Sequence, residues 1–434
     1  MPTSKHSCIG KRNCPLMFLF IVAISIFIVG CAKTMVRNTL PANLEDQVKV
    51  VGFEDVRFWG DKDSPVLDKV AIGSIQKEVA AYGIEELKKP VAYLAISGGG
   101  ENGAFGSGLL NGWTASGKRP TFKLVTGIST GALLAPFAFL GSDYDKQLKE
   151  VYTTITDKDV YEKKSMVTAY WRDAIFGTEP LAEMIAKYID QDVLDAVAGE
   201  YQKGRILLVG TTQLDAERLV IWDMGAIASS SNPEALDLFR SVLLASASMP
   251  VVFPPVFMNV TAGGAEYDEM HVDGGTLTEM MLYNEAIKPM TAHVKQAKAI
   301  VGDDEILKAL MNRQRTLYII RNDPVNPEWK SVKPRLGNIA GRAIGTLVKS
   351  HGEGDLYRIY VLTLRDNIDY NLASVPADFH APSQGMFDQQ YMIKLFNVAY
   401  DMAKNGYPWD KYPPGYQAVT DTSTQPEAGI TSSQ

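Results

Sequence analysis

Two short stretches decide the fold: VAYLAISGGGENG at residues 91–103 and FKLVTGISTG at residues 122–131. Each begins with an apolar run typical of a buried strand and ends in glycines, and helical patterns follow at 104–116 and 130–140. Strands that alternate with helices predict parallel pairing through right-handed crossovers. We therefore expect an α/β fold whose sheet is covered on both faces.

The rest of the chain divides around this centre. Further helices are expected at 75–87, 143–153, 180–190, 233–246 and 386–404, and further strands at 205–212, 217–222, 316–321 and 358–364. The expected segments are a signal peptide (1–30), a linker with an N-terminal extension (31–90), a catalytic domain (91–290), a C-terminal α/β extension packed on it (291–417), and a disordered tail rich in Ser, Thr and Gln (418–434).

The second stretch contains the pattern Gly-x-Ser-x-Gly at residues 127–131, between a strand and a helix. That context is the one a nucleophile elbow requires, because the sharp turn leaves no room for side chains beside the serine. Ser129 would then stand at a helix N-terminus, where the dipole favours developing negative charge. The alternative is that Ser129 only caps the helix.

The first stretch ends in the glycine-rich run Gly98–Gly103. Glycines let backbone N–H groups approach an oxyanion closely, and acyl transfer needs such donors. The letters also fit the dinucleotide-binding pattern G-x-G-x-x-G, which needs an acidic residue about twenty positions later. No Asp or Glu occurs between Asn102 and Ser142, which disfavours a nucleotide site.

A third pattern, Asp273-Gly274-Gly275, supplies a candidate base for the serine. Alone, this pattern usually marks a turn. Burial would have to raise the pKa of the aspartate for it to act as a base.

The order of these blocks resembles the patatin-like phospholipase family, as does the stretch Ala245–Pro250 (ASASMP). The resemblance spans about residues 91–290 and implies a three-layer α/β/α sandwich with a mostly parallel central sheet. It implies the following roles: Ser129 as nucleophile, Asp273 as base, Gly98, Gly99, Gly100, Asn102 and Gly103 at the oxyanion hole, and Gly127, Gly131, Gly274 and Gly275 as motif glycines. Members often carry Arg or Lys where Asn102 stands. Ser246 and Ser248 are interpreted as small packing residues.

The implied activity is a serine acyl hydrolase of the phospholipase A or lysophospholipase type, without metal or cofactor. Two alternatives stay open: an acyltransferase on the same fold, and a lipid-binding lipoprotein without turnover. A Ser–acid–His triad also stays open by chain order, since His293, His351 and His380 follow Asp273. A supporting role for His271 stays open as well.

The N-terminus predicts how the protein is located. Basic residues precede an apolar run of about sixteen residues that ends at Cys31, which resembles a bacterial lipoprotein signal peptide; an uncleaved signal anchor is the alternative. Lipidated Cys31 would tether the protein to a cell-envelope membrane, the outer one if the cell has one.

Removing residues 1–30 removes three of the 43 basic residues and none of the 50 acidic ones, so the charge becomes 40 − 50 = −10. This argues against a nucleic-acid partner, which requires a basic surface. No polybasic patch is expected, so attachment would depend on the acyl chains. The sequence indicates no oligomeric state.

Overall fold

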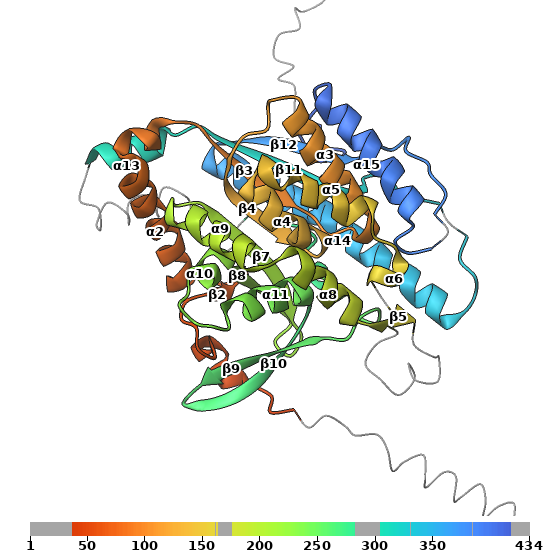
Figure 1. The fold of residues 1–434 in the computed structure, drawn as a ribbon, viewed down its shortest axis with the longest axis horizontal. Coiled ribbons are helices and arrows are strands. Elements are labelled where there is room, and N and C mark those ends of the chain that lie inside the picture. The colour runs from red at the N-terminus through yellow and green to blue at the C-terminus, as the bar shows by residue number, and fades with distance from the viewer. Residues whose placement is uncertain are drawn as a thin grey trace, which may run out of the picture.

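The computed structural model describes residues 37–160, 162–163, 176–282, 304–329, 331–383 and 385–417 (Figure 1). Its strands are β1 (Lys49–Val50), β2 (Arg57–Trp59), β3 (Val91–Ile96), β4 (Phe122–Ile128), β5 (Glu162–Lys163), β6 (Phe176–Gly177), β7 (Ile206–Gln213), β8 (Arg218–Asp223), β9 (Val256–Ala262), β10 (Ala265–Asp273), β11 (Arg315–Pro324) and β12 (Ile368–Val375). Its α-helices are α2 (Pro65–Tyr82), α3 (Gly103–Ala115), α4 (Thr130–Leu140), α5 (Asp145–Thr153), α6 (Asp157–Val160), α8 (Glu179–Tyr188), α9 (Gln191–Gln202), α10 (Met224–Ala228), α11 (Ala235–Ser246), α13 (Asp304–Asn312), α14 (Leu336–Asp366) and α15 (Gln389–Lys404). Five 3₁₀ helices complete the described part: η1 (Ala42–Gln47), η2 (Ile84–Lys88), η3 (Gly100–Asn102), η4 (Ser142–Tyr144) and η5 (Gly274–Thr276).

One ten-stranded sheet forms the middle of the molecule, in the order β1-β9-β10-β7-β4-β3-β11-β12, with β8 on β7 and β2 on β8. Its centre, β7-β4-β3-β11-β12, is parallel, and the strands beyond β7 are added antiparallel. Parallel neighbours end at the same edge of a sheet. The segments that follow β3, β4 and β11 therefore meet at one edge.

Helices cover both faces of this sheet, so side chains alternate along the strands between two cores. In β3, Ala92, Leu94 and Ile96 belong to the larger core, and Tyr93 and Ala95 belong to the other. The larger core lies under α3, α4, α5, α9, α11 and α15, while α2 and α14 contribute to the second one (Figure 1). The expected α/β/α sandwich is confirmed.

Most of the expected elements form within a few residues of their predicted bounds. The helix expected at 75–87 begins earlier, at Pro65, because Ser64 caps it by accepting the Val66 N–H and Pro65 fits the first turn. The segments before residue 91 and after residue 290 contribute β1, β2, β11 and β12 to the same sheet as the strands between them.

The strand expected at 358–364 is wrong, because these residues form the last turns of α14. Ile359 and Tyr360 are buried while Val361 and Leu364 are exposed, which is a helical rather than an alternating period. Asn367, with a φ of 54°, ends the helix, and the chain then enters β12. The apolar and β-branched letters at 358–364 favour a strand, but packing against the sheet selects the helix.

Several expectations concern residues outside the described ranges: the signal peptide, the lipidation of Cys31, the tail after residue 418, and His293. Among the described helices, none combines the length and the apolar character that crossing a membrane requires.

Candidate active site

The elbow between β4 and α4 holds Ser129 in a backbone conformation that side chains rarely adopt, with φ 54° and ψ −125°. Close packing on both sides of the turn enforces this geometry. A Cβ at Gly127 would clash with the backbone of Gly131, and a Cβ at Gly131 would clash with the carbonyl of Ile96. Ser129 is only half-buried and stands at the N-terminus of α4, so its hydroxyl is presented rather than packed away.

Folding brings the carboxylate of Asp273 to this hydroxyl. Ser129 Oγ donates to Asp273 Oδ2 over 2.5 Å, although the two residues are 144 positions apart. Asp273 is the last residue of β10, and β10 pairs with β7, the strand beside β4. The Gly275 N–H donates to Asp273 Oδ1 over 2.7 Å, and Gly274 packs beside the carbonyl of Gly210. The Asp-Gly-Gly turn therefore aims one carboxylate oxygen at the serine.

Burial governs the proton affinity of this carboxylate. It raises the pKa of Asp273 to about 7, against the smaller lowering effects of the Ser129 hydroxyl and the Gly275 N–H. No cation contributes to this shift. An acid with a pKa near 7 can accept and return a proton at neutral pH, which is the property required of a general base.

The glycine loop lies against the elbow. A Cβ at Gly98 would stand 3.2 Å from the Cβ of Ser129. At Gly99, where φ is 143°, a Cβ would clash with the carbonyl of Asn322. This stretch therefore accommodates only glycine, both for its contacts and for its backbone angles.

Not every amide of this loop is free to bind an oxyanion. Gly98 N–H donates to the Glu279 carbonyl over 3.0 Å, Asn102 N–H to the Gly99 carbonyl over 3.0 Å, and Gly103 N–H to carbonyls of η3. Within the described residues, the Gly99 and Gly100 amides have no protein acceptor. Of the five residues expected at the oxyanion hole, only Gly99 and Gly100 therefore have a backbone N–H available to an oxyanion.

Two side chains outside the predicted set hold the glycine loop: Thr130 attaches it to the elbow, and Asn322 attaches the residue before it to β11. Thr130 Oγ1 donates to the Gly100 carbonyl over 2.7 Å and lies 2.9 Å from the buried Tyr152 hydroxyl. From β11, Asn322 donates through Nδ2 to the Ser97 carbonyl over 2.9 Å. A Ser–Asp pair beside a glycine loop is thus assembled at the carboxyl edge of the parallel strands.

This arrangement coincides with a family match: residues 94–287 match the family model of the patatin-like phospholipases. The chain carries a patatin-like phospholipase domain. The match supports the patatin-like fold for this domain and places it with the lipid acyl hydrolase and phospholipase family.

The remaining comparisons add little to the assignment. One similar solved structure is that of VipD from Legionella pneumophila, 13% identical, with a TM-score of 0.33 over 73% of this chain and 67% of that one. A similarity at that level carries no argument. Comparison with curated proteins gave no significant match.

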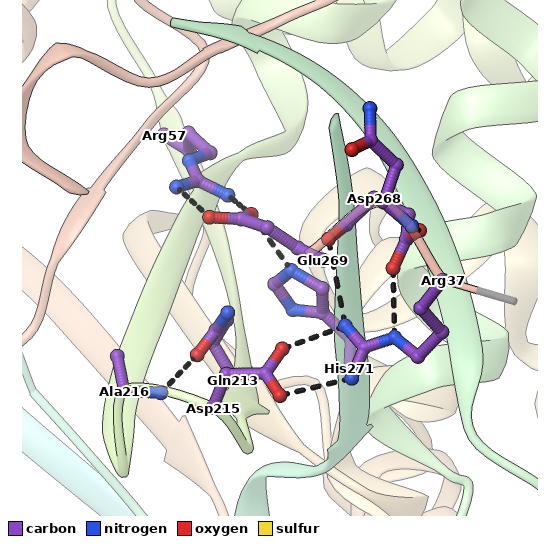
Figure 2. Close-up of polar contacts among 9 residues, drawn as sticks. Arg37, Arg57, Gln213, Asp215, Ala216, Asp268, Glu269 and His271 are labelled. Carbon is purple, nitrogen blue, oxygen red and sulfur yellow. Dashed lines mark hydrogen bonds and ion pairs between the residues drawn. The ribbon is translucent and has the colours of Figure 1, made fainter. Parts of the chain in front are cut away.

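His271 of the patatin-like domain shares a strand face with Asp273 but belongs to a different network (Figure 2). Its Nε2 lies 3.2 Å from Glu269 Oε2 and its Nδ1 lies 2.9 Å from Thr211 Oγ1. Arg57 forms a buried ion pair with Glu269 on the far side. His351 and His380 are exposed, and the hydroxyl of Ser129 forms its hydrogen bond with Asp273 and with no described histidine.

Asn102 does not direct its side chain to the serine. Its Nδ2 donates to Asp323 Oδ1 over 2.9 Å, and its Oδ1 accepts from the Tyr391 hydroxyl over 2.8 Å. The side-chain amide thus links the glycine loop of the patatin-like domain to β11 and α15. A cation at this position would meet the same carboxylate, Asp323.

Ser246 has more than the packing role that its size suggests, while Ser248 contributes its backbone carbonyl. Ser246 Oγ accepts the Ser129 N–H over 3.0 Å and donates to the Gly210 carbonyl over 2.7 Å. The carbonyl of Ser248 accepts the Asp273 N–H over 2.9 Å. The Ala/Ser stretch at the end of α11 therefore supports the backbone of both members of the pair. The only signal for this role in the sequence is the presence of hydroxyls in an otherwise apolar stretch.

Proposed function

We propose that the protein is a serine acyl hydrolase of the phospholipase A or lysophospholipase type, acting on fatty-acyl esters of membrane lipids. The observation that carries this proposal is the 2.5 Å hydrogen bond from Ser129 to Asp273 beside the free amides of Gly99 and Gly100. The patatin-like domain around them supports it.

The first half of the reaction forms an acyl-enzyme. Asp273 takes the hydroxyl proton while Ser129 Oγ bonds to the ester carbonyl carbon, and the Gly99 and Gly100 amides hold the resulting oxyanion. The tetrahedral intermediate then breaks the bond to the alcohol, which leaves with the proton returned by Asp273.

The second half releases the acid. Water gives a proton to Asp273 and adds to the acyl carbon, and the bond to Ser129 Oγ breaks as the serine recovers a proton from Asp273. The α4 dipole and the two amides supply the stabilisation of negative charge that this chemistry needs.

The direct test is mass spectrometry of the products from mixed phospholipids, with the intact protein and with Ser129→Ala. We expect free fatty acid and lysolipid from the intact protein and neither from the variant. A fluorophosphonate probe should label Ser129 in the intact protein only. Absence of both label and products would leave the lipid-binding lipoprotein as the better description.

Transfer to an alcohol shares the same acyl-enzyme, so it is distinguished by product analysis with an added alcohol. Hydrolysis predicts free acid as the main product even with glycerol present; an acylated glycerol as main product would make the protein an acyltransferase. A triad would be indicated if His293→Ala, His351→Ala or His380→Ala were as inactive as Ser129→Ala.

We further propose that lipidated Cys31 anchors the protein to a membrane of the bacterial cell envelope. The apolar run that ends in a cysteine supports this proposal. Cells fed a labelled fatty acid should label the intact chain and not Cys31→Ser; label retained by the variant would refute the anchor.

A further inference from the structure

One segment of the chain has a charge opposite to that of the rest. Between Glu328 and Glu353 there are five lysines and arginines and no acidic residue, in a chain with a net charge of −7. The basic residues are Lys330, Lys333, Arg335, Arg342 and Lys349. This excess of positive charge is local, so the overall acidity of the chain does not reveal it.

The same segment exposes apolar side chains. Leu336, Ile339 and Leu347, in the first half of α14, are 86%, 52% and 60% exposed, and Trp329 just before the helix is 92% exposed. Helical spacing places these α14 residues, together with the alanines at positions 340 and 343, along one side. Monomeric proteins rarely leave such a stripe uncovered unless it meets a partner or a membrane.

The opposite side of this half-helix is attached to the protein. Arg342 donates through Nη2 to the Glu328 carbonyl over 2.6 Å, and Lys349 through Nζ to the Asn326 carbonyl over 2.5 Å. Both acceptors lie in the loop after β11. The stripe therefore faces away from the body, and Figure 1 shows α14 reaching past the other helices at the lower right.

This half-helix leaves the body beside the active site. Arg321 at the end of β11 donates to the Lys349 carbonyl over 3.2 Å and lies 3.8 Å from the carboxylate of Glu279. The carbonyl of Glu279 accepts the Gly98 N–H of the glycine loop. At Gly352 the helix approaches Glu279 so closely that a Cβ would clash with its carboxylate. Two buried residues thus separate the helix from the oxyanion loop.

We propose that the first half of α14 is a docking surface for an anionic lipid bilayer. The surface, which we term the cationic face, consists of Leu336, Ile339 and Leu347 with Lys333 and Arg335. Apolar side chains that enter the headgroup region and cations that meet lipid phosphates are the two features of interfacial helices. The inference rests on the proposed function, because a lipid hydrolase must meet its substrate at such a surface.

Charge complementarity selects this half of α14. Exposed apolar side chains continue at Val361 and Leu364, but the sequence there carries Glu353, Asp355 and Asp366 beside Arg358 and Arg365. An acidic or mixed surface is not attracted electrostatically to anionic lipid. Within the described part of α14 and the loop before it, only the half that adjoins the active site combines exposed apolar groups with an excess of positive charge.

The test compares proteins that all begin at Ala32, so that neither an acyl chain on Cys31 nor the apolar run before it holds any of them to a vesicle. Binding is measured by sedimentation with phosphatidylglycerol or phosphatidylcholine vesicles, and turnover with the water-soluble ester p-nitrophenyl butyrate. Leu336→Gln with Leu347→Gln should weaken binding to phosphatidylglycerol about tenfold. Hydrolysis of the soluble ester should not change.

The charge arm uses Lys333→Ala with Arg335→Ala. At low salt this pair should weaken binding to phosphatidylglycerol by about 30-fold and leave phosphatidylcholine binding unchanged. High salt should abolish the difference between this variant and its parent, because it screens the attraction.

Three of the four control residues lie in α2 and α13, at the opposite end of the molecule (Figure 1), and the fourth, Lys118, lies in the turn between α3 and β4. Tyr82→Gln with Met311→Gln removes two exposed apolar side chains, and Lys118→Ala with Lys308→Ala removes two exposed cations. Neither pair should alter vesicle binding. Equal losses in the controls, or full binding by the α14 variants, would overturn the proposal.

Two further outcomes are decisive. If the leucine variants changed a dimer into a monomer while keeping vesicle binding, the cationic face would be an interface between two copies. If the parent bound vesicles through α14 but hydrolysed no ester and took no fluorophosphonate, docking would stand and the proposed function would fail.

Discussion

Two buried carboxylates on one face of β10 have opposite environments. Asp273, at the end of the strand, faces the Ser129 hydroxyl and the Gly275 N–H, and burial raises its pKa to about 7. Glu269, four residues earlier, is buried as well, which by itself would raise its pKa. The Arg57 guanidinium and His271 outweigh burial there and lower the pKa of Glu269 to about 2.

The difference shows what a neighbouring cation decides. A paired carboxylate stays ionised and holds two parts of the chain together, here β2 and β10. An unpaired carboxylate in the same strand keeps its affinity for a proton and can exchange it with a serine. The carboxylate of β10 that can take part in the proposed reaction therefore lies at the end of the strand, where no described arginine pairs with it.

The largest effect should come from removing the unpaired carboxylate. Asp273→Asn keeps the shape but removes the base, so we expect kcat for a soluble ester to fall by about 10³-fold or more. Glu269→Gln is the matched change in the same row and should retain activity per folded molecule. Comparable loss in both variants would show that the two carboxylates do not differ in function.

The second effect concerns the paired carboxylate. Arg57→Met leaves Glu269 buried without a cation, so the free energy of unfolding in urea should fall by about 3–5 kcal/mol. Adding Glu269→Met should recover much of this loss, because an apolar pair has no charge to desolvate. A single variant as stable as the wild type would mean that the ion pair does not support the fold.

The third effect is on the pH profile. Since the base must be ionised and the pKa of Asp273 is about 7, kcat/KM should fall about tenfold per pH unit below that value. The check is to measure kcat/KM for a soluble ester between about pH 4 and about pH 9, limits set by the stability of the protein. A flat acid limb would indicate a different base.

A smaller effect is expected at the hydroxyl that supports the elbow. Ser246→Ala removes the acceptor of the Ser129 N–H and the donor to the Gly210 carbonyl. We expect kcat to fall about tenfold, in line with about 1–2 kcal/mol for a buried group left unpaired. Ser248→Ala is the control, because its hydroxyl bonds the Leu244 carbonyl in the last turn of α11 rather than the elbow; equal effects would deny Ser246 a positioning role.

The smallest effect separates stability from activity. The pKa of Asp273 is raised from 3.8 to about 7 on folding, so its favourable contribution is present below pH 3.8 and is lost as the pH rises through 7. Asp273→Asn lacks this penalty and should melt about 3 °C higher than the wild type at pH 8. The gain should shrink towards pH 4, since there the carboxyl is protonated in the folded state; a gain that does not depend on pH would contradict this account.

Much of the site could be predicted from the chain because its parts are constrained locally. Gly127 and Gly131 are required by the sharpness of one turn, and Gly99 by the close approach of a neighbouring carbonyl. Such constraints act over a few residues and leave a pattern in the letters. The supporting groups left no such pattern: Asn322 and Ser246 reach the site from strands and helices far along the chain.

The sequence by itself determined the alternation of strands and helices, the elbow at Ser129 and the choice of Asp273, since backbone sterics and hydrophobic period act locally. Only the tertiary structure decided which loop amides stay free, which carboxylate of β10 lacks a cation, and that residues 358–364 continue a helix. It also decided that the end of a basic stretch, at Lys349, is linked to the glycine loop through Arg321 and Glu279. These outcomes depend on which distant groups meet, and packing settles that.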